Sequence, residues 1–175
     1  KFIAKWQSAE LKERSAAQEH FIDLCRLLEE PTPADADPRG DFYCFERGAT
    51  KVTGGDGWAD VWKRGYFGWE YKGKRKDLGA AFAQLQQYTL ALENPPLLVV
   101  CGLDEFVIRT NWTNSVSEKH EFKLADLKDP TVLRKLKWVM SDPEKLKPGK
   151  TRQALTEEAA GEFAALASNL RVRDG

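Results

Sequence analysis

Apolar residues recur along this chain with two different periods. Between residues 8 and 29 they lie three or four positions apart, at Ala17, Phe21, Leu24 and Leu28, which predicts a helix. Elsewhere they form short runs or alternate with polar residues, and both patterns favour strands. The patterns predict a second helix over residues 78–92 and strands over residues 42–47, 58–63, 66–72, 97–103 and 106–112.

Prolines and glycines mark the connections between these elements. Residues 31–40 contain three prolines and are expected to form a surface loop, and the glycine-rich segment 48–57 is expected to join two strands. The chain after Trp112 is expected to be helical, with Thr156 capping the last helix. This order of elements predicts an α/β fold in which a mixed β-sheet is flanked by helices.

The composition is that of one globular domain. The chain has 175 residues, of which 42% are apolar and 31% charged, and its net charge is zero. A nucleic-acid-binding surface on such a chain must concentrate its cations locally. The three cysteines lack metal-ligand spacing, which is typical of reduced thiols in an intracellular protein. The longest apolar run, residues 95–103, is too short to span a membrane.

The strand predicted over residues 66–72 has two different faces. Because side chains alternate along a strand, Phe67, Trp69 and Tyr71 point to one side and Glu70 and Lys72 to the other. The aromatic side is expected to face the core. The opposite side therefore presents a carboxylate beside an amine.

The length of the preceding turn decides where Asp60 lies. A three-residue loop at 64–66 would pair Asp60 with Glu70, whereas a two-residue loop would put the two carboxylates on opposite faces. Two close carboxylates repel each other unless a cation neutralises them, and Mg²⁺ binds one or two carboxylates together with water and phosphate oxygens. With Lys72 nearby to stabilise the attacking water or the phosphate, the hairpin predicts Mg²⁺-dependent phosphodiester cleavage.

Basic residues are concentrated around this hairpin. They are Lys63 and Arg64 in the turn, and Lys72, Lys74, Arg75 and Lys76 just before the helix that Asp77 is expected to cap. Clustered cations and helix N-termini both attract phosphate, so this stretch is a candidate DNA-binding surface. The alternative is a solvated charged loop.

These residues resemble the motif of the PD-(D/E)xK nuclease superfamily. Asp60 matches its aspartate, with Ala59 in place of the usual proline, and residues 70–72 match its Glu-x-Lys. Gln84 and Tyr88 match the QxxxY pattern of RecB-like members, which implies that they line the site. The resemblance implies a restriction-endonuclease-like core with Asp60, Glu70 and Lys72 as catalytic residues and the two acids as metal ligands.

Longer segments resemble the N-terminal nuclease domain of type IIL (MmeI-like) restriction–modification enzymes. They are "ERSAAQEHFIDLC", which begins at Glu13, and "KGKRKDLGAAFAQLQQY", which begins at Lys72. The resemblance implies a nuclease core over residues 1–115 and a helical extension over 116–175 that begins a spacer to a missing adenine-N6 methyltransferase domain. Glu13 would be a further metal ligand, carried on a helix, or alternatively an acid held by an arginine or water; Gln18, in the same segment, would line the site.

The same resemblance implies cofactors and partners. Mg²⁺ would be the metal, with Mn²⁺ able to replace it, and S-adenosylmethionine would serve only the missing methyltransferase part. The partners would be double-stranded DNA, the other domains of the same polypeptide and a transient second copy for double-strand cleavage. The protein would act in a prokaryotic cytoplasm and not at a membrane.

Two other functions are compatible with these residues. The fold could be catalytically silent and serve only to bind DNA or to dock other domains, or the chain could be an unrelated α/β module in which Asp60 and Lys72 form a surface ion pair. His20 is expected at the surface or in a capping role, and the acids at 35–37 are expected to be solvated. Trp58 is expected to pack, with stacking on a base as the alternative.

Overall fold

The computed structural model describes residues 1–9, 13–50, 54–73 and 77–173, with the side chains of 13–15, 49–50 and 167–173 excepted. Its helices are α1 (Phe2–Ser8), α2 (Glu13–Leu28), α3 (Pro33–Ala36), α4 (Leu78–Gln86), α5 (Pro130–Ser141) and α6 (Arg152–Arg173). The strands are β1 (Tyr43–Thr50), β2 (Asp56–Lys63), β3 (Phe67–Tyr71), β4 (Leu97–Cys101), β5 (Glu105–Thr110) and β6 (Lys119–Lys123). Two short 3₁₀ helices, η1 (Leu124–Lys128) and η2 (Pro143–Leu146), flank α5.

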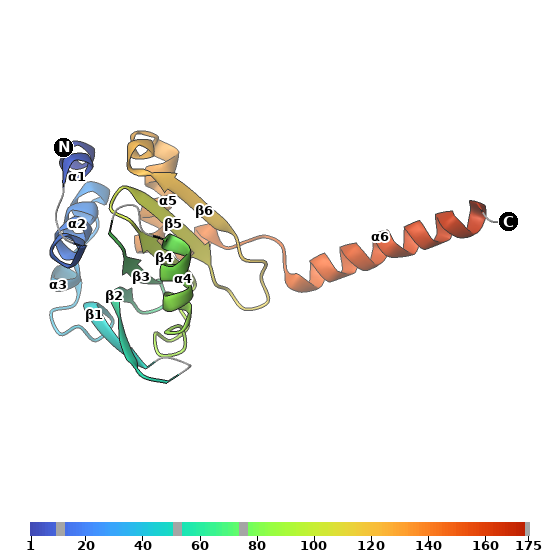
Figure 1. Ribbon diagram of the computed structural model, residues 1–175, viewed down its shortest axis with the longest axis horizontal. Helices are drawn as coiled ribbons and strands as arrows, with labels where there is room; N and C mark the ends of the chain where they lie inside the picture. Colours follow the sequence, from blue (N-terminus) through green and yellow to red (C-terminus); the bar gives the residue numbers. More distant parts are fainter. Residues whose placement is uncertain (10–12, 51–53, 74–76, 174–175) are drawn as a thin grey trace.

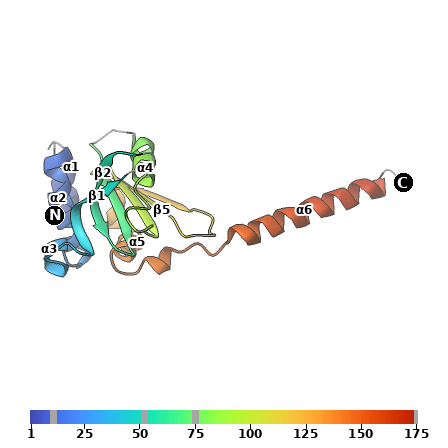
Figure 2. The same cartoon turned by 90° about the horizontal axis from the view of Figure 1, so that it is seen from below.

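The strands form one mixed sheet in the order β1-β2-β3-β4-β5-β6. All neighbouring strands are antiparallel except β3 and β4, which are parallel and are joined through α4. Such a parallel pair needs a crossover connection, and α4 supplies it on one face of the sheet. Helices lie on both faces of the sheet, as the sequence predicts (Figures 1 and 2).

Two hydrophobic cores fill the space between the sheet and the helices. The larger core joins α1, α2 and α5 to one face of the sheet and includes Phe67, Trp69 and Tyr71, which confirms the predicted aromatic side of β3. The smaller core lies under α4 and includes Ala59 and Trp62 of β2. Because β3 is central in the sheet, all five of its residues are buried. They include Glu70, on the face of the strand opposite the aromatic side chains.

Three local predictions are wrong because side chains supply contacts that simple patterning does not reveal. Residues 33–36 form α3 within the predicted loop, since Thr32 and Asp35 make reciprocal capping hydrogen bonds. Asp37 is buried rather than solvated, and its carboxylate accepts hydrogen bonds from the backbone N–H groups of Phe42 and Tyr43. The last helix begins at Arg152 rather than at Thr156, and the hydroxyl of Thr151 accepts the capping hydrogen bond from Ala154.

The sequence predicts that the segment after Trp112 is helical, but the structure shows a strand within it. Residues 119–123 form β6, which pairs with β5, and α5 buries Leu136, Val139 and Met140 in the larger core. By contrast, α6 projects away from the rest of the molecule (Figures 1 and 2). No described helix is both long and apolar enough to cross a membrane.

Candidate active site

The β2–β3 hairpin has the three-residue loop on which the predicted site depends. Lys63 pairs with Phe67, so residues 64–66 form the loop, and Gly65 adopts the left-handed conformation with a φ of 73°. The regular pairing continues as far as Val61 and Trp69. One step further, the carboxylate of Asp60 accepts a hydrogen bond of 2.6 Å from the backbone N–H of Tyr71. Asp60 therefore lies beside Glu70 where the regular pairing of the two strands ends.

The alternation of β2 side chains between the two faces of the sheet is also interrupted at Asp60. Val61 packs in the larger core, whereas both Ala59 and Trp62 pack in the smaller core under α4. On the neighbouring strand the residue facing Asp60 is Glu46, which has a left-handed φ of 51° and interrupts the pairing between β1 and β2. A left-handed conformation is uncommon for a residue other than glycine and is concentrated at functional sites. Sequence reasoning missed Glu46, because no local motif marks this distortion.

Glu70 connects β3 to α4 through hydrogen bonds. The residue is 4% exposed, and its Oε1 atom accepts hydrogen bonds from Lys72 Nζ at 2.9 Å and from Gln84 Nε2 at 3.2 Å. The same amide nitrogen of Gln84 lies 3.3 Å from the hydroxyl of Tyr88. A cation and an amide donor thus compensate for burial of the carboxylate. The structure thus brings together Glu70, Lys72, Gln84 and Tyr88.

Tyr88 reaches this position because residue 57 has no side chain. A Cβ atom at Gly57 would overlap with the phenol ring and hydroxyl of Tyr88. The glycine on β2 therefore lets the hydroxyl of Tyr88, in the turn that follows α4, lie against the strand that carries Asp60.

A cavity of about 660 Å³ lies at this end of the sheet. Its lining residues come from α2, β1, β2, β3, α4 and the turn that follows α4: Ala17, Gln18, Phe45, Glu46, Asp56, Gly57, Trp58, Asp60, Val61, Tyr71, Gln84 and Tyr88. Three of them are acids, and none of the lining residues in the described part of the chain is lysine or arginine. Its volume is in the range of ligand-binding pockets. Gln18, Gln84 and Tyr88, which the sequence predicts to line the site, line the same cavity as Asp60.

Two of the predicted DNA-binding residues lie outside this cavity. The ammonium group of Lys63 donates a hydrogen bond to the carbonyl oxygen of Met140 and lies 4.1 Å from the ring centroid of Tyr66. Burial lowers the pKa of Lys63. Arg64 forms an ion pair of 3.0 Å with Glu93. Both side chains stabilise the surroundings of the turn.

Some predicted residues lie outside the described part of the structure. These are Lys74, Arg75 and Lys76, and the side chain of Glu13 at the start of α2. Asp77, which follows the basic run, caps α4 as predicted: its Oδ1 atom accepts hydrogen bonds from the backbone N–H groups of Gly79 and Ala80.

His20 links helix α2 to strand β3, although the sequence predicts a surface or capping role for it. Its Nδ1 atom lies 2.8 Å from the hydroxyl of Tyr71, and its ring packs edge-on against Trp6. Burial lowers the pKa of His20 to about 3, against a smaller opposing effect of Asp23. This prediction is wrong because β3 turned out to have a helix over its aromatic face.

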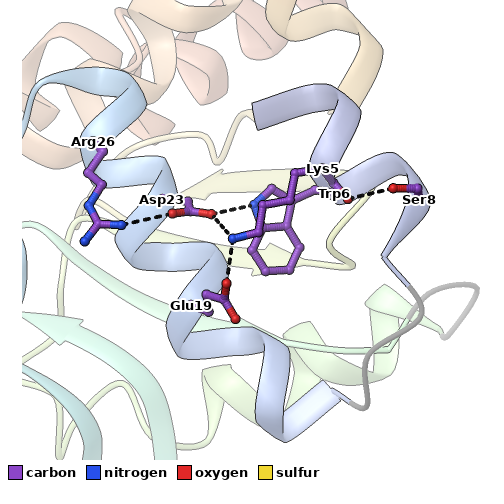
Figure 3. Close-up of polar contacts among 6 residues, drawn as sticks. All are labelled: Lys5, Trp6, Ser8, Glu19, Asp23 and Arg26. Atoms are coloured by element: carbon purple, nitrogen blue, oxygen red, sulfur yellow. Dashed lines mark hydrogen bonds and ion pairs between the residues drawn. The ribbon is translucent and has the colours of Figure 1, made fainter. Parts of the chain in front are cut away.

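Polar contacts also fix α1 against α2 (Figure 3). Asp23 accepts hydrogen bonds from Lys5 at 2.6 Å and from the indole N–H of Trp6 at 3.2 Å, and Lys5 also contacts Glu19. Burial opposes the ionised form of Asp23, but the hydrogen bonds from Lys5 and Trp6 hold its pKa below the usual value. These contacts stabilise the helix whose residues Ala17 and Gln18 form one wall of the cavity.

The acidic groups at the site are chemically suited to Mg²⁺. Asp60 and Glu70 offer carboxylate oxygens, which are the hard ligands that Mg²⁺ prefers, and the ion normally retains several waters. Within the described side chains there is no group of three histidine, cysteine, aspartate or glutamate residues that could hold a metal ion. A bound ion would therefore depend on water and substrate oxygens to complete its coordination.

The six-stranded mixed sheet, with helices on both faces and a helix at the C-terminus, is a restriction-endonuclease-like core. No family model matches the sequence, and no curated protein matches it. One solved structure found by comparison is a cryo-EM structure of a DrdV–DNA complex, with 17% sequence identity and a TM-score of 0.49. The similarity covers 83% of this chain but only 14% of that chain.

Proposed function

We propose that this chain is a Mg²⁺-dependent DNA endonuclease domain that hydrolyses phosphodiester bonds. The observation that carries the proposal is the arrangement of Asp60, Glu70 and Lys72 where the pairing of β2 and β3 ends, beside an open cavity. Two carboxylates and one amine at such a position are the groups that metal-assisted hydrolysis of a phosphodiester requires.

Each residue has a distinct role in this proposal. Asp60 and Glu70 would hold Mg²⁺, which supplies Lewis-acid activation of the phosphate and of water. Lys72 would orient the attacking water and stabilise the negative charge that develops on the phosphate as the new P–O bond forms and the old one breaks. Gln84 holds the Glu70 carboxylate through its amide, and Tyr88 adjoins that amide.

We propose further that the chain is the cleavage module of a single-chain restriction–modification enzyme of the type IIL class. The sequence resemblance supports this assignment, and S-adenosylmethionine would then belong to the methyltransferase part alone. In the proposed division into residues 1–115 and 116–175, the part of the extension that packs on the core comprises β6, η1, α5 and η2. Because the cavity lining has no described cation, we expect other domains or a second copy to supply much of the DNA affinity.

Plasmid nicking at low salt with Mg²⁺ tests the central proposal. Lys72→Ala should reduce the rate by at least about 100-fold, since it removes a group that acts on the transition state. Lys150→Ala is the matched control, because that lysine side chain is 68% exposed and lies in the segment between η2 and α6. Normal cleavage by Lys72→Ala would refute the role of Lys72.

Calorimetric titration with Mg²⁺ separates an active nuclease from a silent one. The unmodified chain should bind the ion, and Asp60→Asn should abolish binding, while Asp41→Asn, at an exposed position, should not. Absence of metal binding in the unmodified chain would favour a silent nuclease-like fold that only binds DNA or docks other domains.

A further inference from the structure

Glu46 has a backbone conformation that its place in the fold does not require. Within the described part of the chain, six residues other than glycine have a positive φ: Glu29, Glu46, Glu93, Asn94, Leu103 and Asn114. Five of these lie between helices or strands, where the chain turns and such a conformation is common. Among the six, only Glu46 lies inside a strand, with a φ of 51°.

The register of the sheet does not explain this conformation. Phe45 pairs with Val61, and Arg47 pairs with Ala59. Each strand therefore has one residue between these two pairs, and β1 contains no extra residue that a distorted backbone would have to accommodate. The left-handed conformation of Glu46 thus changes the direction of side chains rather than the pairing of strands.

The change of direction falls at the same level on β1 and β2. Cys44 packs against the smaller core, and the guanidinium group of Arg47 lies 4.3 Å from the ring centroid of Trp62 in that core. Strict alternation would put residues 44 and 47 on opposite faces of the sheet. The alternation is therefore interrupted at Glu46 on β1 as it is at Asp60 on β2, and the two acids lie on facing strands.

This arrangement of Glu46 is unfavourable for folding in two ways. Like charges on facing strands repel each other, and a left-handed backbone costs free energy at a residue other than glycine. Both costs occur at the wall of the cavity, which Glu46 lines together with Asp60. A cation near the two carboxylates would offset the repulsion between them.

Lys72 does not balance the negative charge around the cavity. Its ammonium group is hydrogen-bonded to Glu70 at 2.9 Å, whereas Glu46, Asp56 and Asp60 line the cavity. These five groups together carry one positive and four negative charges. Such an excess repels the phosphates of DNA in any form, paired or unpaired, until a divalent cation reduces it.

We infer that Glu46 is a positioning residue of the proposed metal site, and that its carboxylate accepts hydrogen bonds from water that hydrates the ion. This inference rests on the proposed function and deepens it. Within the described side chains no three acidic, histidine or cysteine residues could hold an ion directly, so Glu46 acts through water. Mg²⁺ suits this role, because it keeps several of its waters when it binds to protein carboxylates.

Calorimetric titration of the chain with Mg²⁺ tests the role of Glu46. Glu46→Gln keeps the size of the side chain but removes its charge, and it should weaken Mg²⁺ binding by about 10- to 100-fold, the range for groups that surround a metal's direct ligands. Asp56→Asn is the matched control, because Asp56 lines the same cavity and loses the same charge. Its effect should be much smaller. Unchanged binding in Glu46→Gln, or equal losses in the two variants, would overturn the inference.

Urea unfolding of Glu46→Gly and Glu46→Ala tests whether the backbone is held in a costly conformation for the sake of the carboxylate. Glycine adopts the left-handed conformation readily and alanine does not, so Glu46→Gly should unfold at a higher urea concentration than Glu46→Ala. Both variants lack the carboxylate and should bind Mg²⁺ as weakly as Glu46→Gln. An equal or lower unfolding midpoint for the glycine variant, or normal Mg²⁺ binding by either variant, would contradict the inference.

Plasmid nicking by the same proteins distinguishes failure of this inference from failure of the proposed function. If the unmodified chain binds Mg²⁺ and nicks DNA, and Glu46→Gln does both equally well, only the role of Glu46 is wrong. If Mg²⁺ binding depends on Glu46 but the unmodified chain does not nick DNA, the role of Glu46 is supported and the nuclease proposal is wrong. If the unmodified chain does not bind Mg²⁺, both are wrong.

Discussion

Glu70 and Gln84 show how a residue outside the core motif can control the chemistry of the site. The Gln84 amide donates to the same Glu70 oxygen that accepts the hydrogen bond from Lys72. It therefore fixes the direction in which a buried carboxylate faces. Groups that orient a metal ligand in this way commonly affect metal affinity or activity by about 10- to 100-fold.

Gln84→Ala should accordingly reduce Mg²⁺ affinity or the rate of nicking by about 10-fold or more. Gln86→Ala is a matched control, because Gln86 lies on the same helix and is exposed. Calorimetry and plasmid nicking of both variants check this prediction. Equal behaviour of the two variants would show that the contact with Glu70 has no functional role.

His20 makes the stability of the protein depend on pH. Its pKa falls from 6.5 to about 3 on folding, mainly through burial, so the folded protein keeps His20 neutral while the unfolded chain takes up a proton. The contribution of His20 is therefore fully present above pH 6.5 and is lost progressively as the pH falls toward about 3.

Urea unfolding of the parent protein and of His20→Gln between pH 7 and pH 4 tests this linkage. The free energy of unfolding should decrease with falling pH in both proteins, but less steeply in the variant, because glutamine does not titrate. Identical slopes would mean that His20 is protonated in the folded protein over this range.

At the scale of elements, the three-residue turn positions Asp60 relative to Glu70. Gly65 has a φ of 73° and no atom within 4 Å of the place where a Cβ would lie, so only backbone conformation restricts this position. Gly65→Ala should destabilise the protein by about 1–2 kcal/mol, and Gly65→Asn by less, because asparagine tolerates the left-handed region better. Urea unfolding measures the difference; similar losses for alanine and asparagine would contradict this explanation.

Elements set by local chemistry could be predicted from the sequence. The stripe from Ala17 to Leu28, the cap at Asp77 and the turn at 64–66 all depend on neighbouring residues, and all three agree with the structure. Strand β6 could not be found in this way, because its alternating pattern is weak and its stability comes from pairing with β5.

The residues of the candidate site show the same difference between local features, which the sequence predicts, and features that depend on strand pairing. Asp60, Glu70, Lys72, Gln84 and Tyr88 were found because a hairpin and one helix turn determine their relative positions. Glu46 was not found, because its place opposite Asp60 depends on strand pairing and on an unusual φ. The pairing of Trp58 with Gly48, ten residues away in the sequence and on another strand, likewise cannot be read from local sequence.

At the scale of the whole molecule, α6 is a separate feature. It has 22 residues and is therefore about 33 Å long. Near its start, the chain is attached to the rest of the protein by a bridge between Thr151 and Ser115 and by a hydrogen bond from Arg152 Nε to the Ser115 carbonyl oxygen. Its described side chains beyond that point are exposed, including Leu155, Phe163 and Leu166.

Removal of residues 154–175 should leave the thermal unfolding temperature within about 2 °C of the parent value, since little buried surface is lost. Removal of residues 150–175 should lower it further, because the contacts of Thr151 and Arg152 with Ser115 are then lost as well. Differential scanning calorimetry compares the two truncations. A large decrease in the unfolding temperature on removal of residues 154–175 would show that α6 contributes to the folded core.

The order of strands in the sheet has a consequence for how the protein is made. Every strand pairs with its neighbour in the sequence, so each pairing closes a comparatively short loop and incurs a small loss of chain entropy. During synthesis, β1, β2 and β3 are translated before β4, and the hairpin that carries Asp60 and Glu70 can form before β4 pairs with it. The two carboxylates would then meet early in folding, and the later strands would be added to a sheet that already contains them.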